Sequence, residues 1–148
     1  GHVILLSEWT REIKRAGLPA GVVPEHLKCV RGMIIDSFGK LSSLYRYADI
    51  AYIGGGFGAG IHNLNEAAVY GMPVVFGPNH AKFKEASDLI ECGGGFEVTC
   101  KEDFNATVDA FVSSPLSLKD AGRAAARYIS DHLGATDLIY GDLFGRES

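Results

Sequence analysis

The residues best suited to chemistry lie in one stretch, Gly54–Glu66, which reads GGGFGAGIHNLNE. Five glycines fall within seven residues, and the pair His62–Asn63 and then Glu66 follow them. A glycine-rich backbone can bring its N–H groups close to a ligand, because no Cβ stands in the way. Such N–H groups, together with the N-terminus of a following helix, favour a bound phosphate or carboxylate. The stretch predicts an anion-binding loop, with a tight packing turn as the alternative.

Glu66 suggests what the anion belongs to. It lies one helical turn after His62 and on the same face of a helix. A carboxylate there can accept hydrogen bonds from the two hydroxyls of a ribose while the loop binds a phosphate. The pattern therefore predicts a site for a nucleoside monophosphate. The structural alternative is that Glu66 interacts with the helix dipole and that His62 and Asn63 are capping residues.

A dinucleotide site is a second interpretation of the loop, because Gly54–Ala59 fits the pattern G-x-G-x-x-A. That pattern requires an acidic residue at the end of the next strand, where it binds the adenosine ribose. Here the next apolar run, Pro73–Phe76, leads into Gly77–Asn79 and contains no acid at its end. NAD(P) or FAD is therefore the weaker interpretation. A P-loop is excluded, because G-K-[ST] does not occur in the sequence.

The elements that must position these residues alternate along the chain. Short apolar runs predict five strands, at Val3–Leu6, Gly32–Asp36, Ile50–Ile53, Met72–Gly77 and Gly95–Cys100. Helical spacing or helix-end signals predict helices at Ser7–Gly17, Leu41–Ala48, His62–Gly71, Lys82–Gly93, Glu102–Val112, Leu116–His132 and Asp137–Phe144. Strands that are apolar throughout and alternate with helices are typical of a parallel sheet with helices on both faces. We predict one Rossmann-like α/β domain over residues 1–148, with the glycine loop at the ligand-binding carboxyl edge of its sheet.

The composition restricts the class of protein. The 148 residues are 47% hydrophobic and carry a net charge of -4 without any basic run, so we expect no nucleic-acid partner. Three widely spaced cysteines indicate a reducing compartment rather than a disulfide framework. No apolar run approaches the roughly 20 residues of a membrane span, and no signal-peptide pattern is present. We expect a soluble domain.

Longer motifs resemble one family. The glycine loop, His62–Asn63, Glu66 and the run AAVYGMPVVFGP resemble the donor-binding half of 3-deoxy-D-manno-octulosonic acid (Kdo) transferases, which are GT-B glycosyltransferases of lipopolysaccharide synthesis. DSFGKLSSLYRYADIAYIGGG is similar to the family's Asp-x-x-Gly-x-Leu stretch, and FGPNHAKFKEASDLIECGGGF and GATDLIY are similar to its later segments. The resemblance covers residues 32–140. Ile61 and Lys40 depart from the better-known pattern, which has a glycine and often an acid at these positions.

The resemblance implies CMP-Kdo as the donor and a lipid A precursor as the acceptor, at the cytoplasmic face of the bacterial inner membrane. Glu66 would bind the ribose, Asp36 to Gly39 would line the cytidine side, and Asn79 would approach the donor sugar. The CMP phosphate would be held by the helix N-terminus and the loop N–H groups, which are those of Gly55, Gly56, Gly58, Gly60, His62 and Asn63. No cofactor and no metal are expected, because D-x-D is absent and backbone donors can stabilise the leaving phosphate.

The resemblance also implies a missing half. GT-B enzymes place the acceptor site and the general base on a separate N-terminal domain, to which the membrane-attaching segment belongs. A base must reach the acceptor hydroxyl, so no catalytic residue is assigned in this chain. We expect the isolated chain to bind nucleotide and to be inactive. Three alternatives stay open: a GT-B enzyme that uses a UDP-sugar, a Rossmann module that binds NAD(P), and an interaction domain that binds no nucleotide.

Overall fold

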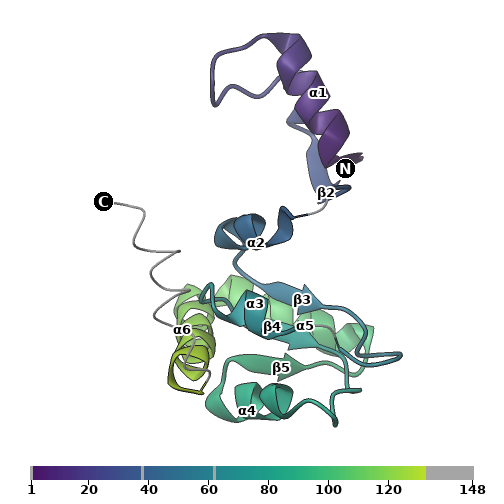
Figure 1. The fold of residues 1–148 in the computed structure, drawn as a ribbon. Coiled ribbons are helices and arrows are strands. Elements are labelled where there is room, and N and C mark those ends of the chain that lie inside the picture. Colours follow the sequence, from purple (N-terminus) through teal and green to yellow (C-terminus); the bar gives the residue numbers. More distant parts are fainter. Residues whose placement is uncertain (1, 38, 62, 133–148) are drawn as a thin grey trace. The chain divides into compact units, whose positions relative to one another are not determined.

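The computed structural model of the chain describes residues 2–37, 39–61 and 63–132 (Figure 1). It divides the chain into two compact units, Gly1–Leu44 and Tyr45–Ser148. Each unit is described by itself below. The single domain expected over residues 1–148 stays a prediction.

The first unit contains a two-stranded parallel sheet. Strand β1 (His2–Leu5) pairs with β2 (Val30–Ile34), and α1 (Leu6–Ala16) and the 3-10 helix η1 (Glu25–Leu27) lie between them in the chain. Helix α2 (Leu41–Leu44) ends the unit. Gly17 ends α1 with a φ of 59°, as predicted from its type. The helix was predicted to start at Ser7, and α1 starts one residue earlier, at Leu6.

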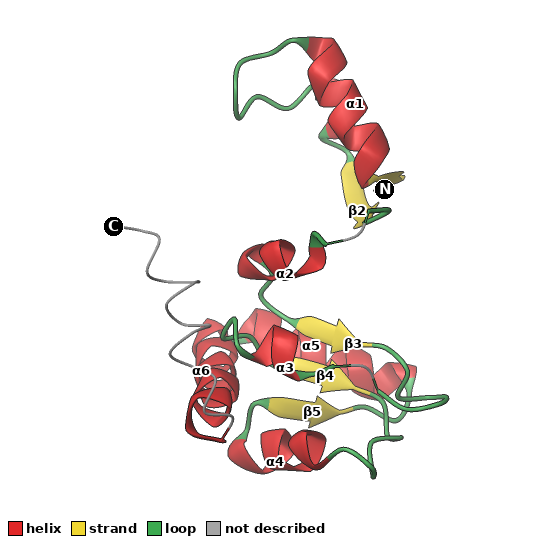
Figure 2. Cartoon of the chain, viewed as in Figure 1, coloured by secondary structure: helices red, strands yellow, loops and turns green. Residues whose placement is uncertain are grey.

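The second unit is built on three parallel strands in the order β3-β4-β5 (Figure 2). These strands are β3 (Ala51–Ile53), β4 (Val74–Phe76) and β5 (Gly95–Glu97). Their last residues, Ile53, Phe76 and Glu97, are in register, so the loops that follow start from one edge. Every residue of the central strand β4 is fully buried. That burial explains why its sequence is apolar throughout instead of alternating.

Helices flank this sheet (Figure 1). They are the 3-10 helix η2 (Tyr45–Tyr47), α3 (Asn65–Ala68), α4 (Lys84–Cys92), α5 (Lys101–Ser113) and α6 (Pro115–His132). The core joins Leu64 and Met72 to residues of α4 and α6 such as Leu89 and Ile129. None of the helices in the described ranges is both long enough and apolar enough to span a membrane.

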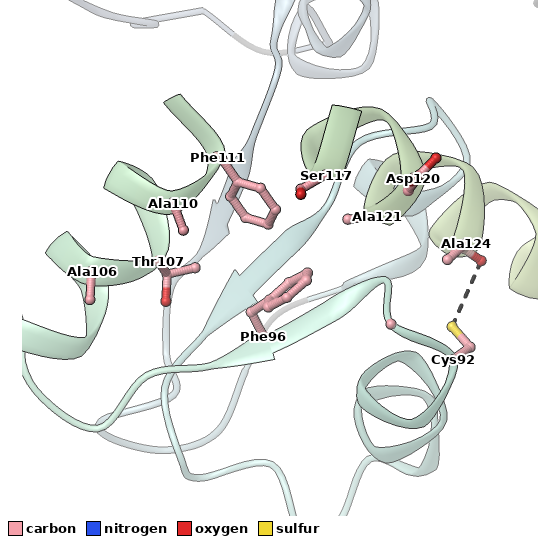
Figure 3. Close-up of a pocket in the computed structure, with 11 residues that line it drawn as sticks. Cys92, Phe96, Ala106, Thr107, Ala110, Phe111, Ser117, Asp120, Ala121 and Ala124 are labelled. Carbon is pink, nitrogen blue, oxygen red and sulfur yellow. Dashed lines mark hydrogen bonds between the residues drawn. The ribbon is translucent and has the colours of Figure 1, made fainter. Parts of the chain in front are cut away.

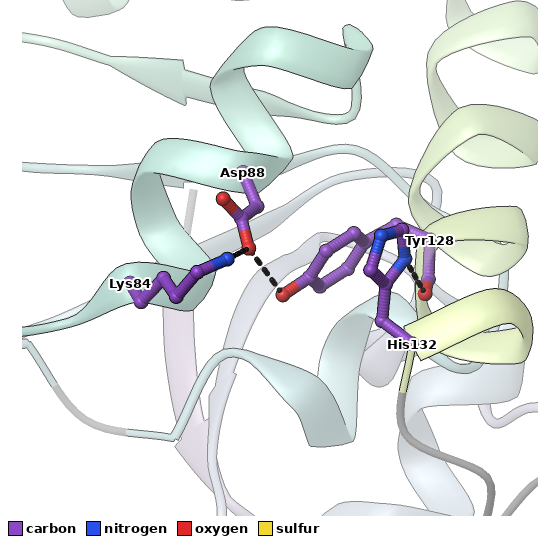
Figure 4. A network of polar contacts seen from close by, with 4 residues as sticks. All are labelled: Lys84, Asp88, Tyr128 and His132. Carbon is purple, nitrogen blue, oxygen red and sulfur yellow. Dashed lines mark hydrogen bonds and ion pairs between the residues drawn. The ribbon is translucent and has the colours of Figure 1, made fainter.

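A polar network fixes α4 against α6 (Figure 4). The Tyr128 hydroxyl donates a hydrogen bond of 3.1 Å to Asp88, which also forms an ion pair with Lys84. The ring of His132 stacks on that of Tyr128, with their centroids 4.6 Å apart. Burial and the Asp88 hydrogen bond raise the pKa of Tyr128 to about 12. The phenol therefore stays protonated and keeps donating to Asp88 over a wide pH range.

Two predicted helices differ from the structure. The helix expected at His62–Gly71 is shortened to the single turn α3, which ends at Ala68, and Gly71 lies in the turn that follows with a φ of 75°. The helix expected at Leu41–Ala48 is divided into α2 and η2. The helix predicted at Asp137–Phe144 lies outside the described residues.

Candidate functional site

The glycine loop follows β3 directly and closes on itself. Gly55 and Gly60 have φ angles of 92° and 125°, which residues with a side chain rarely adopt. The carbonyl of Gly55 accepts hydrogen bonds from the N–H groups of Gly58 (3.0 Å) and Gly60 (3.1 Å). Of the four glycines whose N–H groups were expected to bind phosphate, two, Gly58 and Gly60, thus already use theirs within the loop. Those of Gly55 and Gly56 have no acceptor among the described residues and stay available to an anion.

The loop after β4 is in backbone contact with the glycine loop. A Cβ atom on Gly56 would lie 2.5 Å from the backbone nitrogen of Gly77 and 2.6 Å from its Cα. Glycine is required there because two backbones touch and not because of a positive φ. Asn79 fixes the contact: its N–H donates to the Gly56 carbonyl at 2.8 Å, and its side-chain amide donates to the Gly58 carbonyl. Asn79, which was expected near the donor sugar, holds the loop in this structure.

His80 extends the link to β5. Its Nε2 is in hydrogen-bond contact with the carboxylate of Glu97, the last residue of β5. The ring packs edge-on against Phe76 with a centroid distance of 5.3 Å, and the side chain is only 13% exposed. Consecutive residues, Asn79 and His80, therefore connect the ends of all three strands. His80 and Glu97 were not predicted as site residues: His80 follows the predicted strand Met72–Gly77, and Glu97 lies inside the predicted strand Gly95–Cys100, which the structure ends at Glu97.

Glu66 and Asn63 lie at the start of α3. The Asn63 side-chain oxygen accepts the N–H of Asn65 at 3.0 Å, which is the capping contact considered as an alternative from the sequence. Glu66 is exposed and makes no hydrogen bond or ion pair with another described residue. Burial and, after it, the Glu66 charge raise the pKa of Tyr45. The Glu66 carboxylate is free to accept hydroxyl groups of a ligand. His62 lies outside the described residues.

Asp36 and Gly39 belong to the first unit. The Asp36 carboxylate accepts the Ser7 hydroxyl at 2.5 Å and the Ser7 N–H at 3.1 Å. These hydrogen bonds hold the pKa of Asp36 below its usual range. They also connect the segment after β2 to the first turn of α1. The role expected for Asp36 to Gly39 on the cytidine side stays a prediction.

The chain is similar in sequence to known proteins. No protein-family model matches the chain. The 3-deoxy-D-manno-octulosonic acid transferase of Bordetella pertussis is 32% identical over 147 residues, which cover 91% of this chain and 33% of that protein. The enzyme of the same name from Aquifex aeolicus is 41% identical over 68 residues, 45% of this chain and 19% of that protein. The chain belongs to the Kdo transferase family.

A solved structure gives the fold of this part of a Kdo transferase. The C-terminal CMP-Kdo binding domain of WaaA from Acinetobacter baumannii superimposes with a TM-score of 0.62. The match covers 68% of this chain and 53% of that domain at 20% identity. It confirms the Rossmann-like α/β fold expected for the C-terminal half of a GT-B enzyme. The chain spans about a fifth to a third of the curated Kdo transferases above.

A cavity of about 280 Å³ adjoins the glycine loop of this Kdo transferase domain. The absent Cβ of Gly60 would lie 3.2 Å from the Phe83 ring, which forms one wall of the cavity. Its lining residues are Ile61, Asn63, Leu64, Asn65, Phe83 and Glu85. Asn65 and Glu85 were not predicted from the sequence as site residues. No periodic signal marks them, because the cavity forms where the starts of α3 and α4 meet.

A second hollow, of about 710 Å³, lies between α5 and α6 (Figure 3). Phe96 and Phe111 meet edge to face inside it, and alanines form much of the remaining wall. Cys92 stands at one end, with its thiol directed at the Ala124 carbonyl (Figure 3). Because Cys92 and Gly93 precede β5, this hollow opens near the amino end of that strand, opposite the edge that carries the glycine loop. In the described ranges, no group of three or more His, Cys, Asp or Glu side chains is arranged to hold a metal ion.

Proposed function

We propose that this chain is the donor-binding part of a glycosyltransferase that transfers Kdo from CMP-Kdo to a lipid A precursor. The reaction belongs to lipopolysaccharide synthesis at the cytoplasmic face of the inner membrane. The carrying observation is the closed glycine loop at the carboxyl edge of the sheet, in which the N–H groups of Gly55 and Gly56 have no acceptor among the described residues. Glu66, at the start of α3, likewise has no partner among them. Membership of the Kdo transferase family supports this choice of nucleotide and sugar.

In this proposal the loop stabilises the leaving group. When the bond between Kdo and CMP breaks, negative charge develops on the CMP phosphate. The Gly55 carbonyl and Asn79 fix the loop before the ligand arrives, and the N–H groups of Gly55 and Gly56 have no acceptor among the described residues. Donors fixed in advance need no reorganisation during the reaction, which makes them effective at stabilising developing charge. Helix α3 is a single turn, so the loop donors matter more here than a helix dipole does.

In this proposal Glu66 binds the ribose hydroxyl groups, because its exposed carboxylate has no partner among the described residues. No cofactor or metal takes part. The acceptor and the general base belong to another part of the full-length protein. This chain contributes donor binding and stabilisation of the departing CMP.

Calorimetric titration with CMP, UMP and NADH tests the proposal. We expect CMP to bind best. Glu66→Ala should weaken CMP binding by roughly 1–3 kcal/mol, because the ribose hydroxyls lose a charged acceptor. Glu91→Ala is the matched control, since Glu91 is also exposed on a helix but lies near the end of α4. Tighter binding of UMP would indicate a UDP-sugar enzyme. Binding of NADH alone, or of none of the three, would refute the proposal.

A further inference from the structure

The loop that follows β4 is anchored by His80. The Nε2 atom of its ring is in hydrogen-bond contact with the Glu97 carboxylate at the end of β5. Its backbone N–H donates to the Pro78 carbonyl at 3.0 Å, and its carbonyl accepts the N–H of Phe83 at 2.8 Å. His80 therefore fixes this loop to β5 through its side chain, and through its backbone to Phe83, the residue before α4.

The geometry of this histidine does not suit acid–base catalysis. In catalytic dyads of a histidine and a carboxylate, the second ring nitrogen exchanges a proton with the reacting group. At His80 that nitrogen, Nδ1, is buried and has no hydrogen-bond partner among the described residues. A general base must reach the proton that it removes, which the buried Nδ1 does not do. An ionised carboxylate only accepts hydrogen bonds, so the contact with Glu97 requires a ring proton on Nε2.

Packing alone does not explain a histidine at this position either. The ring lies edge-on against Phe76 and the side chain is 13% exposed, so an apolar residue would fill the space without an unpaired nitrogen. What an apolar residue does not supply is the donor to Glu97. The Glu97 side chain is 38% exposed, so water can solvate its charge without His80. The contact therefore fixes the position of the loop more than it compensates a buried charge.

We propose that His80 is a positioning residue of the phosphate site. Its contact with Glu97 anchors the loop after β4, and the preceding residue, Asn79, holds the glycine loop. The Asn79 N–H donates to the Gly56 carbonyl at 2.8 Å, and its side chain donates to the Gly58 carbonyl. A loop released from β5 therefore loosens both of these hydrogen bonds. The inference rests on the proposed function for the ligand, whereas the anchoring itself is measurable without a ligand.

Titrations of the 148-residue chain with CMP and with cytidine test the effect on phosphate binding. His80→Leu should lower CMP affinity about fivefold and leave cytidine affinity unchanged, because only CMP carries the phosphate. His80→Gln keeps a side-chain N–H donor and should restore most of the affinity. Glu97→Ala should match His80→Leu, and the double variant should add little, since both changes remove one contact. His26→Leu is the control, because His26 also pairs with a glutamate, Glu12, but belongs to the first unit.

Hydrogen exchange without ligand tests the anchoring itself. The Gly60 amide, which donates to Gly55 inside the glycine loop, should exchange faster in His80→Leu and at the wild-type rate in His80→Gln. The Val74 amide, at the other end of β4, should not change. The inference is overturned if Gly60 exchange is unaltered, if Val74 accelerates equally, or if His80→Gln behaves as His80→Leu. Faster Gly60 exchange in a chain that does not bind CMP would support the anchoring and refute the proposed function alone.

Discussion

Gly56→Ala tests whether contact between two loops sets the phosphate site. The added Cβ would lie 2.5 Å from the Gly77 nitrogen, and the backbone φ of Gly56 is not strained. Ordinary contacts need about 3.5 Å or more, so the two backbones must part by about 1 Å. That shift would break the hydrogen bond from Asn79 to Gly56 and turn the Gly56 N–H away from the anion. A lost hydrogen bond to a charged group corresponds to about 1.5–3 kcal/mol, or roughly 10- to 150-fold in affinity.

Titrations with CMP and with cytidine measure this effect. Cytidine lacks the phosphate, so the variant should lose affinity for CMP and keep its affinity for cytidine. Gly54→Ala is the matched control, because a Cβ on Gly54 has nothing within 4 Å. Wild-type CMP affinity in Gly56→Ala would refute the reasoning. An equal loss for CMP and cytidine would show that the mutation disturbs the whole unit instead of the phosphate donors.

Two further predictions concern Asn79 and Tyr128. Asn79→Ala removes the side-chain donor to the Gly58 carbonyl, so CMP affinity, measured by titration, should fall about fivefold. The Gly60 amide should also exchange faster with solvent, as measured by NMR. If both the affinity and the exchange rate are unchanged, Asn79 does not position the loop. The pKa of Tyr128 is raised to about 12, so the folded chain keeps a proton that the unfolded chain loses near pH 10. Its stabilising effect is therefore complete below pH 10 and declines as the pH rises from 10 to 12. Urea unfolding should show this decline in the wild type and a smaller one in Tyr128→Phe, and equal slopes would contradict the assignment.

The strands could be predicted from the sequence because parallel strands are buried on both faces. Val74, Val75 and Phe76 are all fully buried, so β4 appears as an uninterrupted apolar run. Helix ends at glycine were equally predictable, as Gly93 shows with a φ of 86° at the end of α4. These signals are local: each depends on a few neighbouring residues and on burial.

The extent of α3 could not be predicted, because the glycine loop competes with the helix. The helical pattern starts at His62, yet the Asn63 side chain takes the N–H of Asn65 and the helix begins there. The loop must also reach back so that Gly60 can donate to the Gly55 carbonyl. Tertiary geometry thus overrides a helical pattern of ten residues and leaves one turn.

The contacts between the loops could not be predicted from the sequence either. The contact of Gly56 with Gly77 and that of His80 with Glu97 join residues from different βα units. A glycine-rich stretch shows that some N–H groups can approach a ligand. It does not show that those of Gly58 and Gly60 turn inward, because this depends on φ at Gly55 and on the register of the neighbouring loop. The number of free donors is therefore a property of the fold.

The unpaired polar groups around the loop form a pattern that favours a nucleotide sugar over a dinucleotide. The N–H groups of Gly55 and Gly56 in the loop have no acceptor among the described residues, and two such donors suit one phosphate. On the starts of α3 and α4, the side-chain oxygens of Asn65, Glu66 and Glu85 have no hydrogen-bond partner among the described residues. Asn65 and Glu66 are successive residues of α3, so their side chains leave the helix about 100° apart. Asn65 is one of the residues that line the cavity with Phe83, whereas Glu66 is exposed. A ligand with a single phosphate between a ribose and a sugar pairs its phosphate with the loop N–H groups and its hydroxyl groups with the side-chain oxygens. A second phosphate would meet only carboxylate and amide oxygens among these groups.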